Sequence, residues 1–189
     1  MRKRKLKNKV LILDRDGTII VEKNYLKSPE NVELLDNTAA GLEELKKLGF
    51  IFIVITNQSG IARTYFTEKE FNEVNIELDR QLENFNVKIE KYYMCPHHPD
   101  FSGECTCRKP KPELALRAIE DFNIDVEKSW FVGDKCSDIN CGKNSGLKTA
   151  LVLTGYGNQE KNKCNPDIIV SDLLELAEFL KKQTDMTGL

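Results

Sequence analysis

Two carboxylates that lie two residues apart, Asp14 and Asp16, directly follow a short apolar run in the stretch KVLILDRDGT, residues 9–18. A continuous apolar run of this kind is typical of a strand buried on both faces of a parallel sheet. Ligands bind at the carboxyl ends of such strands, and an extended backbone points both carboxylates to one side. The pair could bind a hard cation such as Mg²⁺, or one carboxylate could attack a phosphoryl group. Taken alone, the motif is more typical of an acidic turn.

Further polar signatures follow apolar runs along the chain, at Thr56-Asn57 and Gly133-Asp134-Lys135-x-x-Asp138, and another opens a helix at Arg108-Lys109. In a parallel sheet all strands end at one edge, so these groups can converge there. Carboxylates, a hydroxyl, an amide and cations together suit phosphoryl transfer, because a cation must lie between a phosphate and a carboxylate nucleophile. An aspartate such as Asp14 is already ionised at neutral pH and needs no general base. Asp16 would protonate the leaving alkoxide and then deprotonate the attacking water.

The elements that must position these groups alternate between strand and helix. Strands are predicted near residues 9–13, 50–55, 87–94, 130–132, 149–153 and 167–170. Helices are predicted at residues 36–48, 67–84, 112–122, 138–144 and 173–180, the second of which opens on the capping box Thr67-x-x-Glu70. This alternation predicts an α/β fold whose sheet is parallel with right-handed crossovers.

Length and composition indicate one globular domain over residues 1–189. The formal net charge is −2, and no apolar run approaches the ~20 residues that span a bilayer. We interpret the basic start, residues 1–8, as a solvated arm rather than a nucleic-acid patch, and we expect a frayed tail over residues 183–189. These features predict a cytoplasmic monomer with a small-molecule substrate and no nucleic-acid or membrane partner.

Cysteine and histidine cluster in one loop, residues 95–107, which contains Cys95-Pro96-His97-His98 and Cys105-Thr106-Cys107. In a reducing compartment such clusters indicate metal more often than disulfides. Four ligands at this spacing suit a closed, structural Zn²⁺ site, in which either His97 or His98 could be the fourth ligand. The alternative is a set of ordinary loop thiols or a disulfide. Three other cysteines, Cys136, Cys141 and Cys164, lack ligand spacing and are predicted to be packed or surface thiols.

The ordered set DRDGT, the strand ending in TN, the lysine of RKPKP and GDKxxD resembles the four motifs of the haloacid dehalogenase (HAD) superfamily of aspartate-nucleophile phosphatases. The resemblance extends from about Lys9 to Leu153. It implies a Rossmann-like, mostly parallel sheet with helices on both faces.

The same resemblance implies a role for each motif residue. Asp14 is the nucleophile and Asp16 the acid/base, while Thr56 and Lys109 stabilise the phosphate. Asp14, Asp134 and the main-chain carbonyl of Asp16 hold catalytic Mg²⁺. Asp138 is expected to contact the metal ligands rather than the metal ion itself, to cap the following helix, or to do both.

The cysteine loop CPHHP…CxCRKP resembles a small, cap-less branch of the superfamily whose members act on heptose bisphosphates or on histidinol phosphate. Proteins of that branch use Cys-x-His…Cys-x-Cys for zinc. The resemblance therefore implies a zinc-stapled loop held by Cys95, His97, Cys105 and Cys107.

The stretch NQSGIAR, residues 57–63, resembles the heptose side of this branch. The implied substrate contacts are Glu22, Lys23, Asn24, Tyr25, Thr56, Asn57, Gln58, Ser59, Arg108, Lys109 and Lys135. The implied reaction is Mg²⁺-dependent removal of the C7 phosphate of a heptose 1,7-bisphosphate, through an aspartyl-phosphate, on the way to nucleotide-activated heptose for surface polysaccharide. The alternatives are a histidinol-phosphate phosphatase and, from another class, a zinc-stapled binding module without catalysis.

Overall fold

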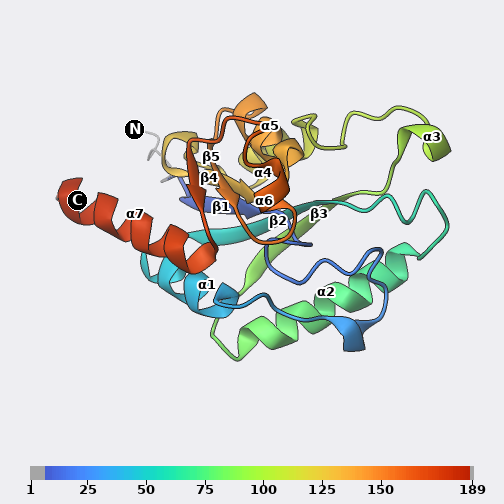
Figure 1. Ribbon diagram of the computed structural model, residues 1–189, viewed down its shortest axis with the longest axis horizontal. Helices are drawn as coiled ribbons and strands as arrows, with labels where there is room; N and C mark the ends of the chain where they lie inside the picture. The colour runs from blue at the N-terminus through green and yellow to red at the C-terminus, as the bar shows by residue number, and fades with distance from the viewer. Residues whose placement is uncertain (1–6, 188–189) are drawn as a thin grey trace, which may run out of the picture.

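The computed structural model describes residues 7–187 and contains one sheet of six parallel strands (Figure 1). The strand order is β3-β2-β1-β4-β5-β6. The strands are β1 Val10–Leu13, β2 Ile51–Asn57, β3 Ile89–Cys95, β4 Trp130–Gly133, β5 Lys148–Val152 and β6 Ile168–Val170. Because β1 pairs with both β2 and β4, the strand that leads into Asp14 is central. The predicted parallel α/β sheet is confirmed.

Four longer helices connect the strands, and a fifth follows the last strand: α1 Thr38–Lys47, α2 Glu68–Glu83, α4 Glu113–Asp121 and α5 Cys136–Asn144, then α7 Leu173–Thr187. Shorter turns are η1 Pro29–Asn31, α3 Pro99–Ser102, η2 Val126–Lys128 and α6 Gly157–Glu160. The predicted capping box opens α2, because the Glu70 amide donates to Thr67 Oγ1 at 3.2 Å and the Thr67 amide donates to Glu70 Oε2 at 2.7 Å. None of the described helices has the length and apolar character needed to cross a membrane.

Alternate residues of β1 pack on opposite faces of the sheet, as period-2 geometry requires. Leu11 and Leu13 belong to the larger core, which includes buried residues of α1, α2 and α7. Val10 and Ile12 belong to a second core, which includes buried residues of α4 and α5. Figure 1 shows the two groups of helices on opposite sides of the sheet. No separate cap domain interrupts the described chain between β1 and β2, where only a loop, η1 and α1 lie.

Several predicted boundaries are wrong. Cys95 is the last residue of β3 rather than the first of a loop, and α3 gives the cysteine segment a helical turn. The final helix was predicted to end at residue 180 but continues past Lys182 to Thr187, so most of the predicted tail is helical. Asn8, placed in the solvated arm, exchanges main-chain hydrogen bonds with Asn123 and Asp125 at 3.0 and 2.8 Å. The rest of the predicted arm, residues 1–6, and the end of the tail, residues 188–189, lie outside the described residues.

Close packing between α1 and α7 generates a stability prediction. A β-carbon added at Gly41 would lie 2.5 Å from the carbonyl carbon of Leu173. We expect Gly41→Ala to lower the free energy of unfolding by about 1–3 kcal/mol, because overpacking forces the helices apart. Denaturant unfolding measures the change. The control Glu43→Ala, at a half-buried position of α1 whose side chain only forms a surface ion pair with Lys47, should shift the free energy by no more than about 0.5 kcal/mol. A Gly41→Ala protein as stable as wild type would contradict this packing.

Candidate active site

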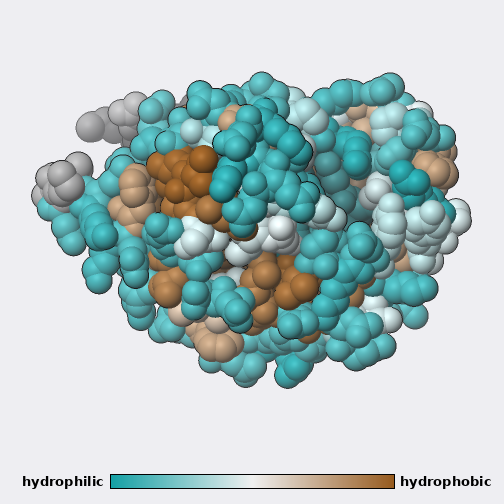
Figure 2. Space-filling view, viewed as in Figure 1, coloured by the Kyte–Doolittle hydropathy of each residue, from teal (hydrophilic) through white to brown (hydrophobic). Residues whose placement is uncertain are grey.

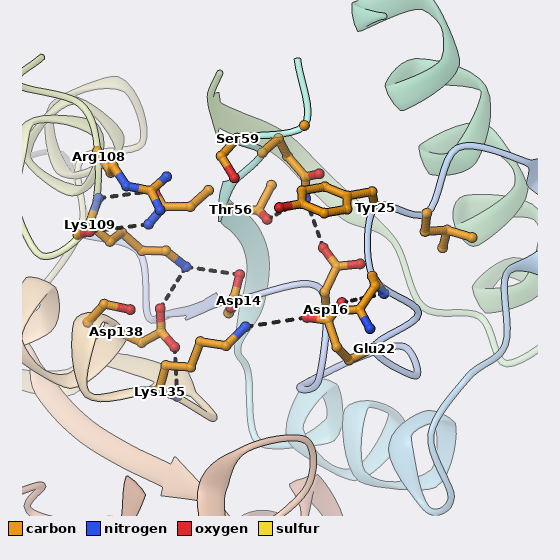
Figure 3. A pocket seen from close by; sticks show the side chains of 16 residues that line it. Asp14, Asp16, Glu22, Tyr25, Thr56, Ser59, Arg108, Lys109, Lys135 and Asp138 are labelled. Carbon is orange, nitrogen blue, oxygen red and sulfur yellow. Dashed lines mark hydrogen bonds and ion pairs between the residues drawn. The ribbon is translucent and has the colours of Figure 1, made fainter. Parts of the chain in front are cut away.

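The predicted nucleophile, Asp14, follows β1 and forms a buried ion pair with Lys109. Lys109 Nζ lies 2.9 Å from Asp14 Oδ1 and 2.7 Å from Asp138 Oδ1. Dashed lines in Figure 3 mark both ion pairs. The same ammonium group donates to the Ile55 carbonyl at 2.7 Å. Burial alone would lower the pKa of Lys109, but the charges of Asp138 and Asp14 outweigh it and raise that pKa above its usual value. Lys109 is therefore a fixed positive charge beside Asp14.

The end of β2 holds the backbone of Lys109 in place. Asn57 Oδ1 accepts a hydrogen bond from the Lys109 amide at 3.1 Å, and Asn57 Nδ2 donates to the Lys109 carbonyl at 3.2 Å. This double contact crosses 52 residues of sequence. It explains how a lysine from the segment after the cysteine cluster reaches the end of the central strand.

The predicted acid/base, Asp16, is held by donors on both carboxylate oxygens. Arg15 Nε and Nη2 donate to Oδ2 and Oδ1 at 3.1 and 3.2 Å. Gln58 Nε2 donates to Asp16 Oδ2 at 2.8 Å and also to Thr56 Oγ1 at 2.9 Å. Gln58 thus joins the predicted phosphate-binding hydroxyl of Thr56 to the predicted acid/base.

Three carboxylates, those of Asp14, Asp134 and Asp138, lie with ligand oxygens within 4.8 Å of one another. Asp134 Oδ2 accepts from the Tyr156 amide at 2.8 Å, whereas Asp134 Oδ1 is buried without a hydrogen-bond partner. Burial first, and then the charge of Asp14, raises the pKa of Asp134 to about 7. A buried carboxylate oxygen that lacks a donor, beside a second carboxylate, is a donor set that suits a hard cation.

Asp138 lies at the start of α5, where it has two roles. Its Oδ2 accepts from the Lys135 amide at 3.0 Å, which satisfies a main-chain donor at the helix start, while its Oδ1 pairs with Lys109. The sequence predicted a helix that begins at Asp138, but α5 begins at Cys136, which places Asp138 in its first turn. The same side chain therefore caps the start of α5 and holds the ammonium group of Lys109.

A cavity of about 310 Å³ lies over these groups. Figure 2 shows a hollow in hydrophilic surface between the region of α5 and the region of α3. Of the predicted substrate contacts, ten line the cavity: Glu22, Asn24, Tyr25, Thr56, Asn57, Gln58, Ser59, Arg108, Lys109 and Lys135. Lys23 is not among them, because its Nζ pairs with Glu33 at 2.8 Å instead.

The sequence reasoning missed some lining residues, notably Ser137 in the first turn of α5. The sequence could have indicated this residue, because Ser137 lies inside the GDKxxD motif. It was missed because the helix was predicted to begin at residue 138, two residues after its true start at Cys136. At the cavity wall, Lys135 Nζ lies 3.4 Å from Glu22 Oε2. The ring of Tyr25 meets that of Tyr65 edge to face at 4.7 Å. A charged pair and an aromatic pair therefore flank the cavity.

The structure brings together three of the four predicted zinc ligands. The sulfurs of Cys95, Cys105 and Cys107 lie within 4.8 Å of one another. The imidazole of His97 is not part of this group, and the His97 carbonyl accepts from Arg108 Nη1 at 3.1 Å. His98 Nδ1 accepts from the Asp100 amide at 3.3 Å, and the other ring nitrogen lies 2.9 Å from Arg63. His98 is thus already engaged elsewhere.

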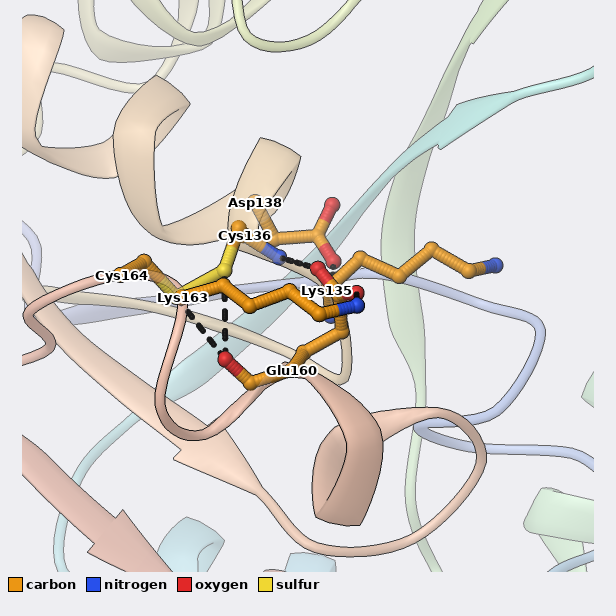
Figure 4. Close-up of a disulfide and its surroundings, with 6 residues drawn as sticks. All are labelled: Lys135, Cys136, Asp138, Glu160, Lys163 and Cys164. Carbon is orange, nitrogen blue, oxygen red and sulfur yellow. Dashed lines mark hydrogen bonds and ion pairs between the residues drawn. A yellow bond between two sulfur atoms is a disulfide. The ribbon is translucent and has the colours of Figure 1, made fainter.

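The prediction of separate thiols is wrong for Cys136 and Cys164, which form a disulfide (Figure 4). The two residues are separated by 28 positions, so their spacing in the sequence gave no sign of the pairing. The bond ties the start of α5 to the segment after α6. Cys141 is a free, buried thiol, as predicted.

Comparison with known proteins agrees with this geometry. A family model described as "HAD-hyrolase-like" matches residues 106–176. The D-glycero-beta-D-manno-heptose-1,7-bisphosphate 7-phosphatase of Pasteurella multocida (strain Pm70) is 37% identical over 178 residues, which cover 92% of this chain and 97% of the relative. The protein of the same name from Escherichia coli (strain K12) is 38% identical over 179 residues, covering 92% and 94%.

Among solved structures, the D,D-heptose 1.7-bisphosphate phosphatase of B. bronchiseptica, complexed with magnesium and phosphate, matches with a TM-score of 0.86 at 29% identity. The match covers 93% of this chain and 99% of that one. Fold, site and relatives together define a HAD-like phosphatase, a phosphoric monoester hydrolase. Within that class, the chain belongs to the family of D-glycero-beta-D-manno-heptose-1,7-bisphosphate 7-phosphatases. The resemblance seen in the sequence is confirmed, and the histidinol-phosphate alternative is not favoured.

The packing around Asp134 generates a prediction for Gly17. Gly17 has a φ of +84°, and a β-carbon there would lie 2.3 Å from Asp134 Oδ2. We expect Gly17→Ala to lower phosphatase activity about 100-fold or more, because a displaced Asp134 carboxylate would weaken the electrostatic stabilisation of the transition state. Steady-state phosphate release measures the loss.

Gly146→Ala is the matched control for Gly17→Ala. Gly146 also has a positive φ, +75°, but no atom lies within 4 Å of its added β-carbon. The Gly146→Ala variant should lose about 1 kcal/mol in its free energy of unfolding and keep its phosphatase activity. Equal activity losses in the two variants would show that backbone strain, rather than Asp134, is responsible.

Proposed function

We propose that this chain removes the C7 phosphate of D-glycero-β-D-manno-heptose 1,7-bisphosphate and releases the heptose 1-phosphate. The observation that carries the proposal is the buried Asp14–Lys109 ion pair beside the unpaired oxygen of Asp134. The choice of sugar and anomer is supported by the names of the relatives that match over most of the chain.

The contacts of Asp14 favour one of its oxygens as the nucleophile. Oδ1 accepts from the Arg15 amide at 2.8 Å and pairs with Lys109, so Oδ2 is the oxygen proposed to attack phosphorus. The bond between Oδ2 and phosphorus forms while the bond from phosphorus to the sugar oxygen breaks. Asp16 gives a proton to that oxygen and later takes one from the water that hydrolyses the aspartyl-phosphate. Lys109 and Thr56 are proposed to stabilise the transferring oxygens.

Asp14, Asp134 and the main-chain carbonyl of Asp16 are the residues proposed to hold Mg²⁺. The unpaired Asp134 oxygen supports this assignment. Near Asp16, the Ile20 amide donates to Arg15 and the Gly17 amide donates to Ile20, so neither hydrogen bond uses the Asp16 carbonyl. When bound, the ion supplies positive charge that neutralises the phosphate oxygens.

The remaining cavity residues are proposed to bind the substrate, a small sugar phosphate. Arg108 and Lys135 add positive charge to the cavity wall, and Glu22, Asn24 and Tyr25 offer polar and aromatic contacts to the sugar. Lys23 is left out of this set because it pairs with Glu33. We also expect the protein to act as a cytoplasmic monomer.

The function is tested by phosphate release with Mg²⁺ from the β and α anomers of heptose 1,7-bisphosphate and from histidinol phosphate. We expect the highest kcat/KM for the β anomer. Asp14→Asn should abolish turnover, with a loss of about 10⁴-fold or more, because it removes the nucleophile without changing the shape of the side chain. The control Asp36→Asn, at an exposed position, should keep full activity. Release that survives Asp14→Asn would contradict the mechanism, whereas a preference for histidinol phosphate would contradict the substrate.

We further propose that Cys95, Cys105 and Cys107, with His97 as the fourth ligand, hold a structural zinc ion. The three sulfurs are close enough to share one ion, and thiolate sulfur is a preferred ligand of Zn²⁺. Burial raises the pKa of the Cys95 thiol, and the neighbouring Cys107 adds to that shift. A bound cation would offset this preference for the protonated thiol. The ion would fix the segment that leads directly into Arg108 and Lys109.

Metal analysis of the purified protein tests the zinc proposal. We expect about one zinc per chain, lost in Cys107→Ser together with part of the thermal stability. Cys141→Ser is the matched control, because Cys141 is also a free cysteine but lies outside the cluster, and it should keep the zinc. Wild-type protein that contains no zinc would overturn this assignment and leave the phosphatase mechanism untouched.

A further inference from the structure

Arg15, the residue between the two motif aspartates, is a fully buried cation that does not line the substrate cavity. A buried guanidinium is unfavourable unless its charge and its N–H groups are satisfied. Nε and Nη2 are satisfied by Asp16, and Nη1 donates to Asn75 Oδ1 at 2.9 Å. The guanidinium carbon also lies 5.0 Å from the centre of the Phe71 ring. The guanidinium group is therefore held on one side by Asp16 and on the other by α2.

Asn75 is an unusual residue for its place on α2. It is buried, with 5% exposure, on a helix face whose other buried residues include Val74 and Leu78. A buried amide among apolar side chains reduces stability unless its polar atoms are used. The Asn75 carbonyl oxygen is used by Arg15, which lies 60 residues away in the sequence. The amide therefore connects α2 to the motif after β1.

The three donors on Asp16 restrict how its carboxylate can act. A carboxylate has about four acceptor positions, and Arg15 and Gln58 fill three of them. Two parallel N–H bonds from one guanidinium also fix the plane of the carboxylate. Since Asp16 lines the cavity, the remaining position is the one available to substrate.

We propose that Arg15 and Asn75 are positioning residues for Asp16. Asn75 anchors the guanidinium to α2, and the guanidinium orients Asp16 so that its available position faces the leaving sugar oxygen. In the step concerned, the bond from Asp14 to phosphorus forms, the bond from phosphorus to the sugar oxygen breaks, and the proton on Asp16 passes to that oxygen. The inference rests on the proposed function, because only a basic alkoxide leaving group needs that proton.

The test compares two substrates that differ in their need for the proton. The sugar oxygen of heptose 1,7-bisphosphate leaves as an alkoxide, whereas 4-nitrophenolate is a stable anion that leaves without protonation. The measured quantity is kcat/KM, which covers only the steps up to phosphoryl transfer to Asp14. We expect Asn75→Leu to lower kcat/KM at least about tenfold for the sugar phosphate and less than about threefold for 4-nitrophenyl phosphate.

Further variants separate positioning from folding. Asn75→Asp keeps the acceptor oxygen and should restore kcat/KM for the sugar phosphate to within about threefold of wild type. Val74→Ala is the matched control, because it removes buried volume from the same helix and should lower stability without changing the ratio between the two substrates. If Asn75→Leu does not fold, Arg15→Lys serves instead, since lysine keeps the charge but cannot form the two-pronged contact.

The outcomes separate the two proposals. Equal losses for both substrates in Asn75→Leu and in Arg15→Lys, with an active wild type, would overturn the positioning role and leave the function intact. A wild-type protein that cleaves 4-nitrophenyl phosphate but no alkyl phosphate would overturn the proposed function, and the positioning role with it. A selective loss for the sugar phosphate that Asn75→Asp reverses would support the positioning role.

Discussion

The site depends on one buried ammonium group. Lys109 supplies a single positive charge to a region where the carboxylates of Asp14, Asp134 and Asp138 lie close together. Burial and the neighbouring carboxylates outweigh the charges of Lys109 and Lys135, so the pKa of Asp134 rises to about 7 and that of Asp138 to about 6, in both cases first through burial. This deficit of positive charge favours the binding of a divalent cation, and a phosphate needs such a cation before it can approach these carboxylates.

The sheet order creates this concentration of charge. Because β1 lies between β2 and β4, the residues at the carboxyl ends of these three strands share one edge. Asp14 comes from β1, Thr56 from β2 and Asp134 from β4. Lys109 follows no strand and reaches the edge through the two hydrogen bonds of its backbone to Asn57. The Lys109 ammonium adds a hydrogen bond to the Ile55 carbonyl of β2, so both the backbone and the side chain of this residue are held against the central strands.

The sequence was informative where function is local to a strand end. The apolar runs before Asp14, Thr56 and Asp134 predicted both the sheet and the residues at its edge, because alternation and burial are properties of consecutive residues. It was uninformative where a contact is made by the tertiary fold. No pattern in the sequence indicates that Asn75 contacts Arg15, and Lys23 could not be distinguished from its neighbours in the loop. The Cys136–Cys164 bond joins two segments that no spacing rule connects.

That disulfide closes a covalent ring of the chain that includes β5 and α6. When this bond is oxidised, a cross-link over 28 positions restricts the unfolded chain and, on the loop-entropy account, stabilises the native state by about 3–4 kcal/mol. Tyr156, whose amide holds Asp134 Oδ2, lies inside the ring, and Asp134 lies just before it. Local opening of the β5–α6 segment would break the hydrogen bond from the Tyr156 amide and free Asp134, a proposed Mg²⁺ ligand. The covalent ring limits how far that segment can move. The cross-link therefore restrains the dynamics of the site as well as the stability of the fold.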